Sequence, residues 1–121
     1  MSKLDEIRKL QDRTKRFAVS IIQFFSDLPK TEVARTIGPQ LLRSGTSVAA
    51  NYRAVCRARS SADFISKISV VLEEADETLF WLELLVEARV INPAESKLLS
   101  AECGELLKIF SASLATAKGN R

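Results

Sequence analysis

The chain has 121 residues, of which 46% are hydrophobic and 27% charged, so we expect one folded domain rather than a disordered chain. It contains no histidine, which excludes Ser-His-Asp and Cys-His nucleophilic catalysis, HExxH metalloproteases and Glu-x-x-His di-iron bundles. The net charge of +3 is unevenly spread: residues 1–60 carry 12 Lys and Arg against 5 Asp and Glu (+7), and residues 61–121 carry 6 against 10 (−4). This segregation predicts either a basic face for phosphate groups or two surfaces that attract each other.

Apolar residues recur at alternating steps of three and four, which is typical of amphipathic helices, and no stretch shows a sustained period of two. The first helix is predicted over residues 4–28, before Pro29. The second is predicted over residues 31–59, with Thr31 as its N-cap. Because proline lacks a backbone donor and clashes with the preceding turn, we expect a kink or short break at Pro39.

The third helix is predicted over residues 61–90, with Ser60 as its N-cap. A strict heptad predicts its core seam, formed by Ile65, Ile68, Leu72, Ala75, Leu79, Leu82 and Val86. The fourth helix is predicted over residues 93–117, with Asn92 as its N-cap, and the tail at 118–121 is expected to fray.

Short connections between long helices make sequential neighbours antiparallel. The predicted fold class is therefore all-α, an up-down-up-down antiparallel four-helix bundle in a single domain over residues 1–121.

Cys56 and Cys103 lie 47 residues apart on apolar helical faces, without a CxxC motif, so we interpret both as core residues. We expect no catalytic residue, no metal site and no cofactor, and hence no enzyme. The charged N-terminal segment lacks the apolar run of a signal peptide, and no apolar window reaches the length of a membrane span. These features predict a cytoplasmic protein.

Two groups of basic residues are candidates for binding the phosphates of nucleic acid. They form one stripe on the first predicted helix and one on the second: Lys9, Arg13 and Arg16, and Arg43, Arg53 and Arg57. Such contacts would give strong salt dependence and little sequence preference. The alternative is a solvated basic face with no ligand.

The third predicted helix carries an acidic stripe that points away from its seam, so these carboxylates are expected to be solvated. Phe80 and Leu84 lie in the middle of the stripe, beside Glu73 and Glu77, and Trp81 lies on its flank. An apolar patch ringed by one sign of charge is typical of an interface, which predicts an oligomer contact; alternatively, Trp81 joins the core. Acidic and basic surfaces on different helices predict head-to-tail assembly into a closed ring.

Four stretches resemble a known family: LLRSGTSVAANYRA at 41–54, SSADFISK at 60–67, VLEEADET at 71–78 and WLELL at 81–85. They are similar to the bacterial four-helix bundle proteins encoded in intervening sequences of 23S ribosomal RNA genes. More remotely, they resemble the accessory bundle proteins of diversity-generating retroelements, which bind nucleic acid and a reverse transcriptase. The resemblance implies a small cytosolic bundle that assembles as a homopentamer around a central channel.

The chain departs from that family at residues 51–55, where it has Asn-Tyr-Arg-Ala-Val and many members have Asn-Ile-Ala-Glu-Gly. A role of that Glu therefore has no counterpart here, and Arg53 is an addition. From the residues and the resemblance together we predict a non-enzymatic oligomer that associates with RNA or another nucleic acid. The alternative is a structural or adaptor module that binds an unidentified protein partner and no nucleic acid.

Overall fold

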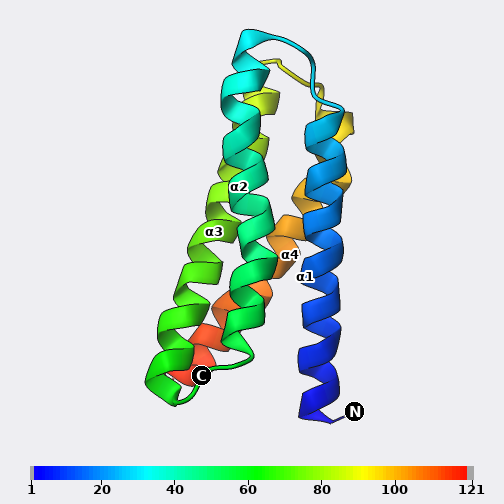
Figure 1. The fold of residues 1–121 in the computed structure, drawn as a ribbon. Coiled ribbons are helices and arrows are strands. Elements are labelled where there is room, and N and C mark those ends of the chain that lie inside the picture. The colour runs from blue at the N-terminus through cyan, green and yellow to red at the C-terminus, as the bar shows by residue number, and fades with distance from the viewer. Residues whose placement is uncertain (1, 120–121) are drawn as a thin grey trace.

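The computed structural model describes residues 2–119, which form four α-helices and no strand. The helices are α1 (Lys3–Ser26), α2 (Glu32–Val55), α3 (Ser61–Glu87) and α4 (Pro93–Ala117). Successive helices run in opposite directions and are joined by short connections (Figure 1). The all-α, up-down-up-down four-helix prediction is confirmed. Of the tail predicted to fray, Asn120 and Arg121 lie outside the described residues.

The helix starts follow the sequence closely because each has a side-chain cap. The oxygens of Thr31, Ser60 and Asn92 accept hydrogen bonds from backbone amides three residues later, at 3.1–3.2 Å. These bonds satisfy amide groups that have no partner inside the helix. All three predicted N-caps are confirmed, and Ser2 caps α1 in the same way.

Three helices end earlier than predicted, and α1 does so by two residues, at Ser26 rather than residue 28. The backbone tightens after α2, where the amides of Arg57 and Ala58 bond to carbonyls three residues back, so the helix ends at Val55 rather than near residue 59. Helix α3 ends at Glu87 because Arg89 adopts a left-handed conformation with φ of 59°. The amide of Val90 then bonds to the Leu85 carbonyl, which is the hydrogen bond of a Schellman motif.

Helix α2 runs through Pro39 as one helix, so the break that we considered there is absent. Gly38 and Gly45 are buried on the same helix and let α2 approach α1 closely. A Cβ atom at Gly45 would lie 2.7 Å from Cγ1 of Ile21 on α1, closer than side chains pack.

The buried core contains residues of all four helices, but the predicted seam of α3 is partly wrong. Its buried residues are Ile68, Val71, Ala75, Thr78, Leu82 and Leu85. Four predicted members are only half-buried: Leu72, Leu79 and Val86 pack at the edge of the core, and Ile65 is not among the side chains that pack against it. The seam shifts because α3 packs between α2 and α4 and the buried hydroxyl of Thr78 faces Ser44 of α2 at 2.9 Å.

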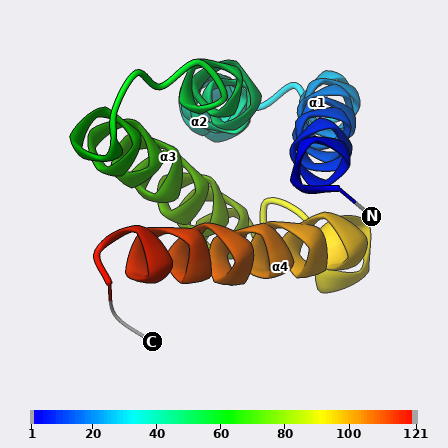
Figure 2. The ribbon, with the colours of Figure 1, turned by 90° about the horizontal axis from the view of Figure 1, so that it is seen from below.

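The four helices do not pack evenly. Figure 2 shows α1, α2 and α3 arranged in an arc, with α4 lying obliquely across the open side. Helices α1 and α4 make far fewer contacts than the other neighbouring pairs. The bundle is therefore open between the N-terminal half of α1 and the C-terminal half of α4 (Figure 1).

Candidate nucleic-acid interface

The basic residues predicted on α1 lie along the opening between α1 and α4. Arg13 forms an ion pair there with Glu102 of α4, in which its Nε and Nη2 atoms donate to the two carboxylate oxygens at 2.8 and 2.6 Å. This hydrogen-bonded pair raises the pKa of Arg13. Lys9 and Arg16 are exposed, and among the described residues neither has an ion-pair partner. Of the three basic residues predicted on α1, Lys9 and Arg16 could therefore bind a phosphate without breaking an ion pair that the structure shows.

Arg43 lies on the opposite side of the molecule, between α2 and α3. Its Nη1 and Nη2 atoms donate to Glu74 and Glu77 of α3, at 2.9 and 2.6 Å. The bond from Arg43 lowers the pKa of Glu77, which also accepts a hydrogen bond from Trp81 Nε1 at 3.2 Å. Arg43 therefore joins two helices in this structure, and a phosphate would have to compete with two carboxylates for it.

Arg53 and Arg57 are exposed near the end of α2, and no carboxylate within the described part of the chain pairs with either. Arg53 lies in a furrow between α1 and α2, beside Lys15 and Asp12. Arg57 borders a hollow of about 530 Å³ at the connection between α2 and α3. These two arginines, four residues apart in the chain, therefore resemble Lys9 and Arg16 in being exposed predicted candidates without a carboxylate partner among the described residues.

The same hollow brings in two basic residues that the sequence analysis did not single out, Arg59 and Lys67. Lys67 Nζ donates to Asp63 at 2.6 Å, and Asp63 also accepts from the backbone amide of Arg59 at 3.0 Å. These bonds lower the pKa of Asp63, led by the one from Lys67. Three cations and one carboxylate thus surround the hollow. The two closely spaced arginines of Arg57-Ala58-Arg59 are the feature of the sequence that could have indicated this basic hollow.

The six predicted basic residues therefore do not form one patch. Three border the α1/α4 opening, one bridges α2 and α3, and two lie at the C-terminal end of α2. Helix periodicity assigns residues to faces of one helix, but it does not show which charges pair across helices.

The predicted interface residues of α3 lie together on its outer face. Phe80 is 51% exposed and packs edge-on against Trp81, with ring centroids 5.0 Å apart and an interplanar angle of 67°. Leu84 is half-buried and Glu73 is exposed, whereas Trp81 packs partly against the core. Trp81 therefore packs partly on the core, as the alternative interpretation predicted, and its ring also contacts Phe80. The oligomer contact itself stays a prediction.

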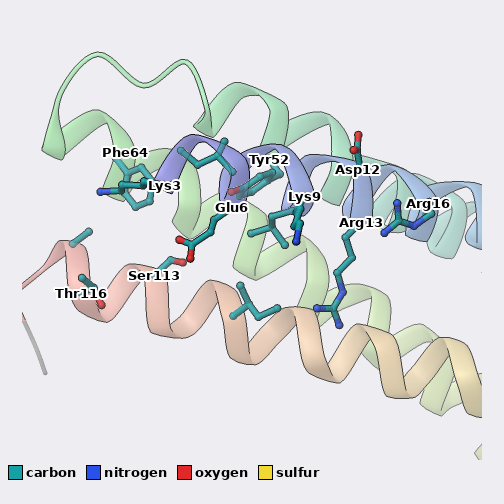
Figure 3. Close-up of a pocket in the computed structure, with 14 residues that line it drawn as sticks. Lys3, Glu6, Lys9, Asp12, Arg13, Arg16, Tyr52, Phe64, Ser113 and Thr116 are labelled. Atoms are coloured by element: carbon teal, nitrogen blue, oxygen red, sulfur yellow. The ribbon is translucent and has the colours of Figure 1, made fainter. Parts of the chain in front are cut away.

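The opening between α1 and α4 is a groove of about 950 Å³ (Figure 3). Its floor is apolar and includes Tyr52 of α2 and Phe64 of α3, while Ile7 and Ile109 lie on its two walls. In Figure 3 the side chains of Lys9 and Arg13 extend from α1 toward the groove, and Asp12 points away from α4. An apolar floor beside a basic wall suits an amphipathic surface better than bare phosphate.

Neither cysteine is arranged for chemistry. Cys103 is fully buried, with its Sγ atom 3.3 Å from the Ala75 carbonyl, and burial raises its pKa to about 12. Cys56 is half-buried at the core edge, and burial also raises its pKa. Within residues 2–119 no group of three or more His, Cys, Asp or Glu side chains could hold a metal ion. No helix in this range is both long and apolar enough to span a membrane.

The comparisons with known proteins agree with the resemblance seen in the sequence. A crystal structure of a protein of unknown function from the S23 ribosomal protein family of Bacteroides thetaiotaomicron is 35% identical to this chain, with a TM-score of 0.80. The match covers 86% of this chain and 96% of the other. No curated protein matches the sequence. The family described as 23S rRNA-intervening sequence protein matches residues 7–112, and the chain belongs to this family.

Proposed function

We propose that this protein is a non-enzymatic RNA-binding bundle of the cytoplasm that contacts phosphates through the C-terminal end of α2. The observation that carries the proposal is the state of the arginines: Arg53 and Arg57 are exposed and lack carboxylate partners in the described chain, whereas Arg13 and Arg43 are paired. Arg59 borders the same hollow as Arg57 and extends this positive surface across the α2–α3 connection, whereas Lys67 beside it is paired with Asp63. Membership of a family named for 23S rRNA intervening sequences makes RNA the favoured nucleic acid.

Binding of this kind depends on phosphate charge rather than on base identity. Phosphate contacts fix the position of a protein on nucleic acid but carry no sequence information directly. We therefore expect affinity to fall steeply with salt and to differ little among unrelated structured RNAs. Lys9 and Arg16 would add a second, separate contact region on α1.

The test is the electrophoretic mobility of a structured RNA with micromolar protein at low salt. Replacing Arg53 and Arg57 together by Ala should weaken binding similarly for unrelated sequences and reduce the slope of log K against log salt by about 2. Arg35→Ala with Arg89→Ala is the matched control, because it removes the same charge from exposed residues at the other end of the bundle. Unchanged RNA mobility with wild-type protein contradicts the proposal, and equal losses in both double variants contradict the site.

The second part of the proposal is that the chain assembles with itself. The exposed Phe80 beside an acidic stripe supports a contact between copies. The resemblance supplies the number, which is a ring of five around a central channel. The competing function is an adaptor that binds another protein; it predicts a salt-tolerant complex with one protein partner and no affinity for RNA.

A further inference from the structure

The outer face of α3 carries an apolar ridge that no other helix of the bundle covers. Phe80 and Leu84 are one helical turn apart, and Leu84 is not among the side chains that pack against the core. The indole Nε1 of the neighbouring Trp81 is already bonded to Glu77, so the ridge offers apolar surface with no unsatisfied donor at Trp81. Exposed carboxylates flank it on the same helix: Glu73, Asp76, Glu83 and Glu87.

The groove between α1 and α4 has the opposite character. Ile7 and Ile109 line it from its two walls; both are half-buried, and neither is among the side chains that pack against the buried core. Four cations, Lys3, Lys9, Arg13 and Arg16, line it with two carboxylates, Glu6 and Asp12. Because Arg13 is paired with Glu102, Lys3, Lys9 and Arg16 are the lining cations without an ion pair among the described residues. The wall formed by α4 contributes no charged side chain to the lining.

We propose that the Phe80–Leu84 ridge of one copy lies in the α1/α4 groove of a second copy. A row of side chains at positions i and i+4 forms a ridge of the kind that packs into the grooves of another helical surface. The acidic flanks of α3 would then lie against the basic wall of α1, which fixes the orientation of the contact. This inference rests on the self-association part of the proposed function and is independent of RNA binding.

Because the ridge and the groove are different surfaces of the same chain, the contact is heterologous. Each dimer therefore still has one unoccupied ridge and one unoccupied groove. Complementation between two variants tests this property directly. Phe80→Glu disables the ridge and leaves the groove intact, whereas Ile109→Glu disables the groove and leaves the ridge intact. Neither residue belongs to the core, so both variants should fold, as circular dichroism would verify.

Sedimentation velocity at tens of micromolar should find each variant alone at the monomer mass of 13.4 kDa. Their equimolar mixture should form a dimer of about 27 kDa (twice 13.4 kDa) and nothing larger, because only one working contact remains. Leu98→Glu is the matched control: Leu98 is 86% exposed on α4 and lies outside both surfaces, so this variant should assemble like the wild type.

Each other outcome overturns the inference in a distinct way. If Phe80→Glu is monomeric while Ile109→Glu assembles like the wild type, the ridge contacts a surface other than the groove. If both single variants assemble normally, the copies meet through other surfaces, although self-association stands. If the wild type is monomeric, a second copy does not occupy the groove. If that monomer still shifts the mobility of RNA, the RNA-binding proposal stands.

Discussion

At the residue scale, two glycines of this bundle have opposite surroundings. Gly45 is buried where α2 meets α1, and an added Cβ would lie 2.7 and 2.8 Å from Cγ1 and Cγ2 of Ile21. Ile21 is fully buried and branched at Cβ, so it cannot rotate away. Gly104 on α4 has no atom within 4 Å of its hypothetical Cβ. The same substitution should therefore have opposite effects at the two sites.

We expect Gly45→Ala to destabilise the protein by about 1 kcal/mol. The gain in helix propensity is about 1 kcal/mol, but overpacking of a filled core costs about 1–3 kcal/mol. Gly104→Ala should stabilise it by about 0.5–1 kcal/mol, since only the propensity changes. Urea denaturation of both variants measures the difference. Equal stabilisation by the two substitutions would mean that α1 and α2 are not in the close contact described.

At the element scale, one polar pair explains the register between α2 and α3. Ser44 and Thr78 are fully buried and face each other at 2.9 Å, and each hydroxyl also lies near a carbonyl of its own helix. A hydrophobicity pattern assigns such polar positions to the surface, so the heptad predicts a core position at Leu79 instead of Thr78. The four helices, their caps and their order were predictable from local signals. The buried face of α3 was not, because it depends on a hydroxyl pair across two helices.

Thr78→Val should destabilise the protein by about 1–2 kcal/mol, because it leaves the buried Ser44 hydroxyl with only its local carbonyl partner. Ser44→Ala combined with Thr78→Val should cost less than the sum of the two single changes, with a coupling of at least about 0.5 kcal/mol. A double-mutant cycle by chemical denaturation measures this coupling. Additive effects would show that the two hydroxyls do not stabilise each other.

The ion pair between α2 and α3 should give the stability a pH dependence. The hydrogen bond from Arg43 lowers the pKa of Glu77 below its usual value of 4.5, so the folded state holds this carboxylate ionised more strongly than the unfolded chain does. Its contribution is complete above about pH 4.5 and is lost as pH falls through the lowered pKa of the folded state.

Arg43→Gln should therefore reduce the stability near neutral pH slightly, by less than about 1 kcal/mol because the pair is partly exposed. The difference from the wild type should shrink as the pH falls below about 4.5, and thermal melts at several pH values measure it. Arg35→Gln is the control, since Arg35 is exposed on the same helix without an ion pair among the described residues. A loss that stays constant down to pH 3 would contradict a role for Glu77.

At the scale of the whole molecule, the shape was less predictable than the fold class. A symmetric bundle would close α1 against α4 along its length, and nothing in the helix periodicity indicates that α4 lies obliquely. The obliquity leaves Ile7 and Ile109 facing a groove that Lys9, Arg13 and Arg16 border, whereas Arg53 lies in a separate furrow between α1 and α2. Arg13 joins α1 to α4 through Glu102. The charge pattern of the sequence indicates only a phosphate contact for this arginine.

This asymmetry bears on assembly, because a contact between unlike surfaces continues from copy to copy until the ring closes. For the ring of five that we propose, light scattering behind a sizing column should find about 67 kDa, five times 13.4 kDa. The mass should stay at this value over a tenfold range of concentration, whereas an open head-to-tail chain would grow. Trp81→Glu places a carboxylate in the patch and should shift the mass towards the monomer, with the helical circular dichroism checked because Trp81 also packs on the core. A wild-type mass near 13 kDa at tens of micromolar would contradict the ring, and with it any central channel.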